Sequence, residues 1–346
     1  MPGMVKVSFF QDCDEISWDD FVDRSPQGTL FHLIGWKKVM EKTFHYRSWY
    51  LAAYDDCGMC GCLPLFQVKN AIFGNALISV PFGVTGGICA NNSLAVHSLL
   101  HRAQALAEQL RADYIEFRHA SCCGVDLPDK DLYVTFEREL ESDMDKNMAA
   151  IPRKQRRMIR QGMKLDLVSS VNGQESLAAF YGIYAHSVHN LGTPVFPYKY
   201  FQYLMDCFDD KIRIHLVGHQ GTPVAAVLTF FYKNRVMPYY GGALKSYFHL
   251  AVNDFMYWEL MKYGCEHGFK IFDFGRSKRG TGSFDFKRHW GFEPRPLPYQ
   301  YSLHRRKEIP NVSPSNSKIK PFIALSKNLP LPIANIVGPY LIRYVP

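Results

Sequence analysis

The chain lacks any apolar run long enough to cross a membrane as a helix. Its longest apolar stretch, residues 222–232, is far shorter than the roughly 20 residues that a spanning helix needs. The N-terminus lacks a basic segment followed by an apolar one, so no secretory signal peptide is predicted. The nine cysteines follow no secretory signal, which indicates reduced thiols in a cytoplasmic protein.

A large excess of charge of one sign is also missing. The 346 residues carry a formal net charge of +8, which fits anionic partners but is small for a protein dedicated to binding nucleic acid. Apolar residues make up 47% of the chain, so two domains of ordinary size can each bury a core.

The cysteine spacing does not favour a metal site. Cys57 and Cys60 have C-x-x-C spacing, but a structural zinc site needs four ligands. The only other close pair is Cys122 and Cys123, whose adjacency is poor for chelation. We favour the alternative, a hairpin turn at residues 55–58 between two strands.

The predicted elements occur twice in the same order: strands, a glycine pair, a helix and an acid-bearing strand. In the first half they are predicted at residues 48–54, 61–68, 76–80, 83–87, 93–112 and 114–118. In the second half they are predicted at residues 213–218, 223–232, 235–240, 241–242, 252–267 and 271–274. Gly87 and Glu116 are 29 positions apart, and Gly242 and Asp273 are 31 apart. We therefore predict two copies of one α/β (α+β) unit, each a mixed, mostly antiparallel sheet flanked by helices.

Composition predicts a division into four parts. We expect an N-terminal domain at 1–145, a basic junction at 146–168, a C-terminal catalytic domain at 169–306, and a linker with an apolar tail at 307–346. The tail is broken by prolines, and it either packs on the body or lies on a membrane surface. Packing is favoured because the prolines prevent a long amphipathic helix.

The junction contains a run of cations without one acidic residue between them. The cations are Lys146, Arg153, Lys154, Arg156, Arg157, Arg160 and Lys164. Such a run either holds phosphate groups or RNA, or forms a solvated helix face.

The segment 271–294 gathers cations, glycines and aromatic residues after one buried strand. Asp273 has apolar neighbours and needs a partner, and Arg276 is close enough to form a clasp that shapes either the turn or a site. Lys287 lies between Phe286 and Trp290. Its ammonium either points inward, to bind phosphate or an acyl oxyanion, or extends to the surface.

Two nucleotide-binding patterns are absent from this segment. The stretch S-K-R-G-T-G at 277–282 has G-x-G, but we predict no apolar-periodic helix after it, and it has no Walker lysine-serine pair. It also differs from the acetyl-coenzyme A pattern Arg/Gln-x-x-Gly-x-Gly/Ala, because Ser277 stands at the first position. No match occurs near Gly241 and Gly242 either, so a standard acetyltransferase is less favoured.

The chain resembles the FemAB-like aminoacyl- and acyltransferases, and within them the group associated with exosortase/PEP-CTERM systems. The resemblance spans most of the chain. The stretches that carry it are SLLHRAQALAEQLRADYIEFRH, PRKQRRMIRQGMK, GTPVFPYKYF, FDFGRSKRGTGSFDFKRHWGFEPRPLPY and LPLPIANIVGP.

This resemblance implies two tandem GNAT-like domains. Family members move an aminoacyl group from charged tRNA to an amine of a peptidoglycan precursor, by direct attack of the amine and without a covalent enzyme intermediate. Lys287 matches the lysine of the family's Phe-Lys-x-x-x-Gly-like segment, and Arg276 matches the arginine after the Asp-Phe-Gly step. The chain has no long coiled-coil insertion suited to tRNA.

We therefore predict a cytoplasmic N-acyltransferase that acts on an amine of a cell-envelope or exopolysaccharide-related precursor. The catalytic candidates are Lys287, Asp273 and Arg276. The substrate-binding candidates are Tyr239, Tyr240, Asn253, Arg279, Trp290, Arg153 and Arg157. No metal and no resident cofactor is expected, and the co-substrate is aminoacyl-tRNA or acyl-coenzyme A.

Two other functions stay open from the sequence. The chain is either an acyl-coenzyme A N-acyltransferase or a non-catalytic GNAT pair that binds RNA or another polyanion. The expected partners are a small, lipid-linked or nucleotide-linked amine acceptor and charged tRNA, with no DNA, and the tail is a candidate for peripheral membrane contact.

Overall fold

The structure is a computed structural model that describes residues 4–70, 74–121, 123–310 and 329–344. The chain divides into two compact units. The first unit comprises Met1–Tyr133, Pro296–Ile319 and Arg343–Pro346, and the second comprises Val134–Arg295 and Lys320–Ile342. The units differ from the expected ranges in two places, because residues 134–145 lie in the second unit and residues 296–306 in the first.

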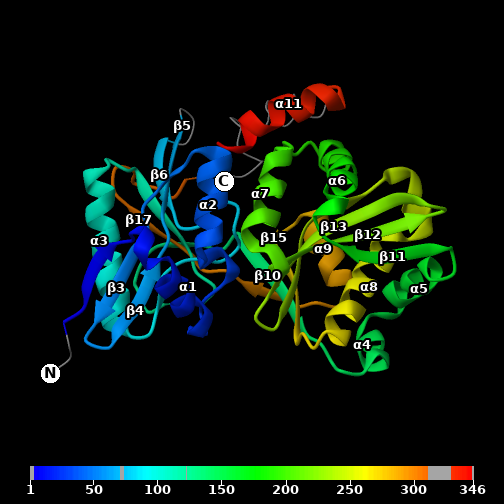
Figure 1. Cartoon of the computed structure of the whole chain (residues 1–346), viewed down its shortest axis with the longest axis horizontal. Helices are drawn as coiled ribbons and strands as arrows, with labels where there is room; N and C mark the ends of the chain where they lie inside the picture. Colours follow the sequence, from blue (N-terminus) through cyan, green and yellow to red (C-terminus); the bar gives the residue numbers. More distant parts are fainter. Residues whose placement is uncertain (1–3, 71–73, 122, 311–328, 345–346) are drawn as a thin grey trace. The chain divides into compact units, whose positions relative to one another are not determined.

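The first unit contains two sheets with helices packed on them (Figure 1). The four-stranded antiparallel sheet has the order β1 (Lys6–Phe9), β3 (Leu51–Asp55), β4 (Gly58–Leu63), β7 (Cys89–Ala90). The six-stranded sheet has the order β2 (Arg47–Ser48), β5 (Phe66–Asn70), β6 (Gly74–Ile78), β8 (Tyr114–Arg118), β17 (Tyr299–Leu303), β9 (Asp129–Lys130). The helices are α1 (Glu15–Arg24), α2 (Ile34–Phe44) and α3 (Ser93–Gln109).

The hairpin expected at residues 55–58 is confirmed. β3 and β4 pair antiparallel, and Gly58 at the turn has a φ of 114°, which L side chains rarely adopt. Cys57 is exposed and Cys60 is buried, so the C-x-x-C spacing belongs to a turn.

The second unit is built on one seven-stranded sheet. Its order is β11 (Leu167–Asn172), β12 (Ile212–His219), β13 (Thr222–Tyr232), β14 (Arg235–Ala243), β15 (Ile271–Lys278), β10 (Tyr133–Glu139), β16 (Pro294–Pro296). The helices of this part are α4 (Met144–Ala150), α5 (Arg153–Gly162), α6 (Leu177–Leu191), α7 (Tyr198–Phe208), α8 (Val252–Glu266), α9 (Gly282–His289) and α11 (Leu331–Ile342).

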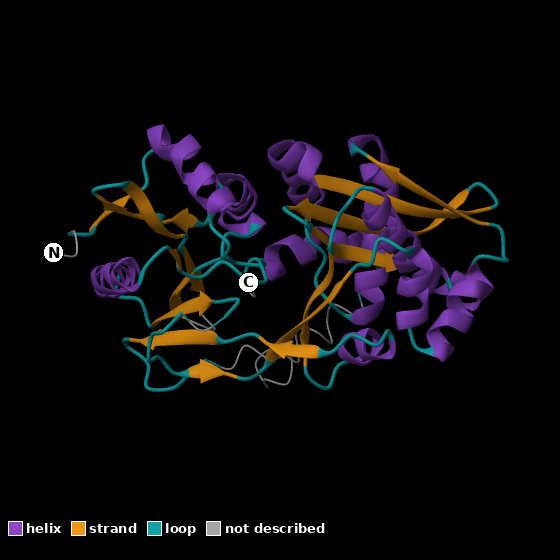
Figure 2. Ribbon diagram, turned by 90° about the horizontal axis from the view of Figure 1, so that it is seen from below, coloured by secondary structure: helices purple, strands orange, loops and turns teal. Residues whose placement is uncertain are grey.

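Helices cover both faces of this sheet (Figure 2). The reason is visible in β13, where every residue from Val224 to Tyr232 is buried, on both sides of the strand. A strand that is apolar on both faces needs a covering layer on each. α6 and α8 both pack on β13 and β14 and supply these layers.

The predicted repeat is confirmed in the topology. In the first unit, β6 and β8 pair in parallel and α3 connects them through the chain. In the second unit, β14 and β15 pair in parallel, and α8 connects them. Each copy thus contains one strand–helix–strand crossover of the same kind.

The two larger sheets each contain a strand from a distant part of the sequence. β10 precedes α4 in the chain and lies between β15 and β16. β17 follows β16 in the chain and lies between β8 and β9 of the first unit. The position of β17 explains why the first unit includes a segment that follows the second unit in the chain.

A helix follows the glycine-rich turn, contrary to the prediction. α9 begins after Thr281, whose hydroxyl accepts a hydrogen bond from the Phe284 N–H at 3.4 Å. The sequence of α9 lacks the apolar periodicity by which a helix is usually predicted, because its buried residue is the charged Lys287.

Candidate functional site

The two parallel strands of the second unit pair over only a short length. β14 and β15 are paired at Arg235–Ile271 and Val236–Phe272. On its other edge β14 stays paired with β13 as far as Ala243, with a register shift opposite Leu228 and Thr229. In its carboxyl half, β14 is therefore paired with β13 along one edge, and its other edge is not paired with β15. A strand edge of this kind can pair with an extended ligand that carries amide groups.

Asp273 lies in a charged cluster drawn from three neighbouring strands. Its Oδ2 is 3.6 Å from Nη1 of Arg235, which also bonds Glu137. Its Oδ1 accepts hydrogen bonds from the Gly275 N–H at 2.8 Å and the Thr135 hydroxyl at 3.3 Å. Burial raises the pKa of Asp273, and the charge of Arg235 opposes this rise. Asp273 thus forms an ion pair with Arg235, and the clasp with Arg276 stays a prediction.

Lys287 extends from α9 into the interior beside the same cluster. Its Nζ donates hydrogen bonds to the carbonyl oxygens of Gly275 at 2.9 Å and Arg276 at 3.1 Å. The ammonium lies 5.6 Å from the Phe136 ring centroid. Burial lowers the pKa of Lys287 to about 7, although the carboxylate of Asp273 partly restores it. Of the two orientations that the sequence left open for this lysine, the structure shows the inward one, since only 9% of the residue is exposed.

Two predicted binding residues lie elsewhere in this segment. Trp290 is fully buried in the core against Tyr257, Phe274 and Phe286. A ring with no exposed surface packs the fold and does not line a binding site, so the assignment of Trp290 is corrected. Arg279 is exposed in the turn that follows β15.

The two tyrosines of β14 have different surroundings. Tyr240 is buried, and its hydroxyl is 2.7 Å from the hydroxyl of Tyr200 on α7. Its ring also packs against Phe196 and Phe201. Tyr239 is half-buried and packs edge-on against Phe230 at 5.0 Å. Of the pair, Tyr239 is the one with surface left to meet a ligand.

Five cations of the basic run lie on α5, while Lys146 lies on α4 and Lys164 follows α5. A buried hydrogen bond attaches α5 to the first turn of α8. The Gln155 amide donates to the Asp254 carboxylate, whose pKa is raised by burial. Asn253 is the neighbouring residue in that first turn. Arg153 and Arg157 are exposed on α5. The Gln155–Asp254 bond therefore connects α5, which carries the two arginines, with the N-terminus of α8, which carries Asn253. Main-chain N–H groups at a helix N-terminus favour anions.

A groove of about 990 Å³ lies along α5. Six of its lining residues are cations, and these are Arg153, Lys154, Arg156, Arg157, Arg160 and Lys164. No acidic residue lines it among the described residues. The helix is anchored by Gln155, Ile159 and Gly162, which are buried at helical spacing. The run is a solvated helix face that lines a concave cationic surface, and binding of phosphate groups or RNA there stays a prediction.

The predicted residues therefore fall into two groups in the second unit. Asp273, Arg276 and Lys287 belong to the cluster at β15 and α9, and Arg153, Arg157 and Asn253 belong to the basic surface. Sequence reasoning missed Arg235 and Asp254, because each one acts through a partner that is remote in the chain.

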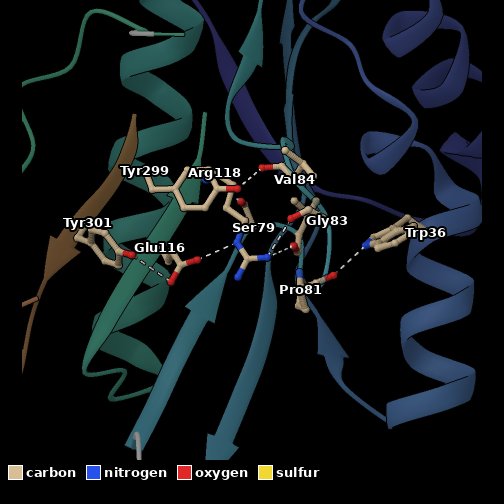
Figure 3. Close-up of polar contacts among 10 residues, drawn as sticks. Trp36, Ser79, Pro81, Gly83, Val84, Glu116, Arg118, Tyr299 and Tyr301 are labelled. Carbon is tan, nitrogen blue, oxygen red and sulfur yellow. Dashed lines mark hydrogen bonds and ion pairs between the residues drawn. The ribbon is translucent and has the colours of Figure 1, made fainter. Parts of the chain in front are cut away.

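The corresponding place in the first unit is occupied by Arg118 (Figure 3). Its guanidinium bonds the Glu116 carboxylate at 2.7 Å and donates to the carbonyls of Val80 at 2.9 Å and Gly83 at 3.0 Å. The Tyr301 hydroxyl lies 3.4 Å from the second Glu116 oxygen. Only 2% of Arg118 is exposed, so this buried ion pair ties the chain after β6 to the end of β8.

A small cavity of about 200 Å³ in the first unit contains two buried imidazoles, and sequence reasoning missed them. Burial and the neighbouring His32 lower the pKa of His119 to about 4. His119 Nε2 is 3.4 Å from Sγ of Cys123, and His32 Nε2 is 3.0 Å from the Gly87 carbonyl oxygen. Gly87 is required there, because a Cβ would lie 2.3 Å from the His119 ring.

Comparison with protein families gives a match that lies within the second unit. Residues 145–288 match the profile of the family described as acetyltransferase (GNAT) domain. This match contains the basic surface, β14, β15 and Lys287. Comparison with curated proteins gives no match.

Solved structures with a similar fold extend over most of the chain. FemX is 15% identical, with a TM-score of 0.70, and the match covers 87% of this chain and 98% of FemX. The C-terminal domain of a putative lysylphosphatidylglycerol synthetase from Agrobacterium fabrum is 12% identical, with a TM-score of 0.55 and coverage of 86% and 93%. A tandem GNAT protein from the clavulanic acid biosynthesis pathway is 10% identical, with a TM-score of 0.51 and coverage of 87% and 98%. The chain therefore has a tandem GNAT-like fold.

Proposed function

We propose that the chain is a FemAB-like N-acyltransferase that transfers an aminoacyl or acyl group to an amine of a cell-envelope or exopolysaccharide-related precursor. The observation that carries this proposal is the short pairing of β14 and β15 beside the buried Lys287, inside the region that matches the GNAT profile. The acceptor class comes from the sequence resemblance, including its exosortase-associated group, and the fold similarity to FemX supports it.

In the proposed reaction the neutral acceptor amine attacks the acyl carbonyl carbon directly. A C–N bond forms, the bond from the carbonyl carbon to the donor's oxygen or sulfur breaks, and the amine proton leaves to solvent or to the leaving group. The enzyme contributes position and stabilisation of the oxyanion that develops on the carbonyl oxygen.

Lys287 is the group that we assign to this oxyanion. An ammonium has three N–H donors, and two of them bond the carbonyls of Gly275 and Arg276. The third donor stays for a developing negative charge. Asp273 stabilises the charged form of Lys287, and its ion pair with Arg235 holds β15 beside β14. Arg276 and Tyr239 line the reacting groups.

The basic groove along α5 is the proposed site for the anionic part of the donor or of a nucleotide-linked acceptor. Its six cations match a chain of phosphates, and the α8 N-terminus with Asn253 adds main-chain donors. Phosphate contacts of this kind make binding sensitive to salt. A cytoplasmic location is part of the proposal, because charged tRNA and acyl-coenzyme A are the donors considered.

The direct test is transfer of a radiolabelled aminoacyl or acyl group to an amine acceptor by the wild type and by Lys287→Met. Removal of one oxyanion donor is expected to lower kcat by about 10²–10³. Lys262→Met, an exposed lysine of α8, is the matched control and is expected to keep wild-type activity. Equal turnover by all three proteins would remove Lys287 from the mechanism.

An acyl-coenzyme A transferase is the second candidate, since the matched family is named for acetyl transfer. Thermal unfolding is measured with coenzyme A and with charged tRNA in parallel. A rise in Tm with coenzyme A alone supports the thioester donor, and a rise with charged tRNA alone supports the ester donor. Salt-sensitive binding of both without any turnover would identify the third function, a polyanion-binding GNAT pair.

A further inference from the structure

Exposed apolar side chains gather on two segments of the second unit. Of the twelve large apolar side chains that are exposed among the described residues, five lie on α11 and on the segment from the end of α6 to the start of α7. Their exposed fractions are 69% for Leu191, 39% for Tyr198, 45% for Ile333, 67% for Ile336 and 67% for Tyr340. Single exposed apolar residues are ordinary, but a gathered set marks an interaction surface.

These two segments lie against each other in the structure. His189 Nε2 is 2.8 Å from the Leu329 carbonyl oxygen, just before α11 begins. Farther along, the close approach at Gly338 leaves no room for a side chain, because a Cβ there would lie 2.7 Å from the Val195 main-chain nitrogen. The stretch that contains Leu191 therefore runs beside α11, and Figure 1 shows α11 next to α6.

α11 has a buried face and an exposed face, and both are apolar. Its buried residues are Ala334, Gly338 and Ile342, which are spaced by four positions. Its exposed residues Ile333, Ile336 and Tyr340 follow the same helical spacing on another side. The favoured prediction that the tail packs on the body is therefore met by one face only, and the other face stays in contact with solvent.

The surface around this face has no carboxylate from its own segments. Residues 176–205 and 329–344 contain no aspartate and no glutamate. The exposed Lys199 supplies a cation at the start of α7. A second copy of the chain is a poor occupant, because each copy carries a net charge of +8 and would repel the other.

We propose that α11 and the adjoining 191–198 segment bind the surface of an anionic lipid bilayer. α11 has 12 residues and is about 18 Å long, so it lies in the headgroup region and does not span the hydrocarbon core. Isoleucine and leucine side chains enter the acyl boundary, and the tyrosines suit the headgroup level. The cation and the lack of carboxylates match the negative potential of anionic lipids. This face would bring the chain to an acceptor that is attached to a lipid.

The test is co-sedimentation of the full chain with vesicles of phosphatidylcholine, alone or mixed with phosphatidylglycerol. We expect reversible binding that is stronger to the mixed vesicles. The variant Ile333→Gln/Ile336→Gln/Tyr340→Gln is expected to lower the vesicle partition coefficient about tenfold, because each change removes apolar contact with lipid. The matched control, Ile16→Gln/Leu94→Gln, alters exposed apolar residues of two other helices and is expected to bind as the wild type does.

Other occupants give other outcomes. The proposal would be overturned if the triple variant bound vesicles as well as the wild type does. It would also be overturned if only Arg153→Gln/Arg157→Gln lost binding, because the lipids would then bind in the basic groove. A concentration-dependent dimer that the triple variant abolishes, without vesicle binding, would identify a second copy as the occupant. Circular dichroism confirms that each variant is folded. None of these measurements needs acyl transfer, so failure here leaves the proposed enzyme activity untouched.

Discussion

The two copies of the crossover end their parallel strand pairs in different ways. In the first unit, β6 and β8 stay paired through Glu116, and the Ser79 N–H continues the ladder to the Glu116 carbonyl at 3.0 Å. Arg118 then bonds the chain beyond, at Val80 and Gly83. In the second unit, β14 and β15 pair at two positions, and Lys287 from α9 bonds the continuing strand β15 instead.

This difference shows how one topology yields a structural copy and a candidate catalytic copy. Arg118 is paired with Glu116, bonds two carbonyls and is 2% exposed, so a ligand has almost no surface of it to contact. A lysine with two carbonyl partners and a lowered pKa retains one donor and can titrate near neutral pH. The first unit thus has a buried ion pair at the place where the second unit has a buried lysine with a lowered pKa.

The largest expected effect is the loss of the Arg118 ion pair. Arg118→Met leaves the buried Glu116 carboxylate without its cation and is expected to lower the free energy of unfolding by about 3–5 kcal/mol. Glu116→Gln/Arg118→Met is expected to recover part of this loss, since no uncompensated charge remains. Urea unfolding measures the free energy of unfolding of the single and the double variant. A loss below about 1 kcal/mol in the single variant would contradict the role of this pair.

Acid should destabilise both units through one buried histidine in each. Burial lowers the pKa of His119 and of His215 to about 4, below the unfolded value of about 6.5. The unfolded chain then binds more protons between these values, so stability is full above about pH 6.5 and declines toward pH 4.

The decline is expected to reach about 3 kcal/mol for each histidine at pH 4, from the pKa difference. Chemical unfolding from pH 7 to pH 4 measures it. His119→Gln and His215→Gln should each remove the contribution of one histidine from the decline of the free energy of unfolding between pH 7 and pH 4. Two variants with the wild-type slope would show that these imidazoles are already charged in the folded chain.

The pH dependence of activity sharpens the role of Lys287. Because its pKa is about 7, the ammonium form predominates below pH 7 and is lost above it. If the ammonium stabilises the oxyanion, kcat is expected to fall about tenfold per pH unit above that value. Lys287→Arg stays charged and should show no such fall. A wild-type kcat that rises through pH 7 would instead make the neutral amine a base.

The smallest effects are expected at the glycine pair of each copy. A Cβ at Gly87 would lie 2.3 Å from the His119 ring, and one at Gly242 would lie 2.2 Å from the Ser187 Cβ. Gly87→Ala and Gly242→Ala are therefore expected to lower Tm through a loss of about 1–3 kcal/mol each. Gly182→Ala, on the open side of α6, is the control and should be neutral or stabilising. Equal Tm for all three variants would contradict these close approaches.

Much of the repeat could be predicted from local patterns. The strand 114–118, the helix of α8 and the long apolar strand β13 follow from periodicity and from the glycine turns around them. The aromatic neighbours Phe286 and Trp290 left the inward and the surface orientation of Lys287 both open, and its burial in the structure decides for the inward one. α9 itself was missed, since the buried charge of Lys287 breaks the apolar spacing by which such a helix is recognised.

By itself, the sequence determined the order of strands and helices, the duplicated crossover and the cationic character of α5, because these depend on near neighbours in the chain. Only the tertiary structure decided that β10 and β17 pair with strands far from them in the sequence, that Asp273 forms an ion pair with Arg235, and that Trp290 is buried in the core. Those outcomes depend on contacts between residues far apart in sequence, whose energies are set by burial and by three-dimensional packing and not by local spacing.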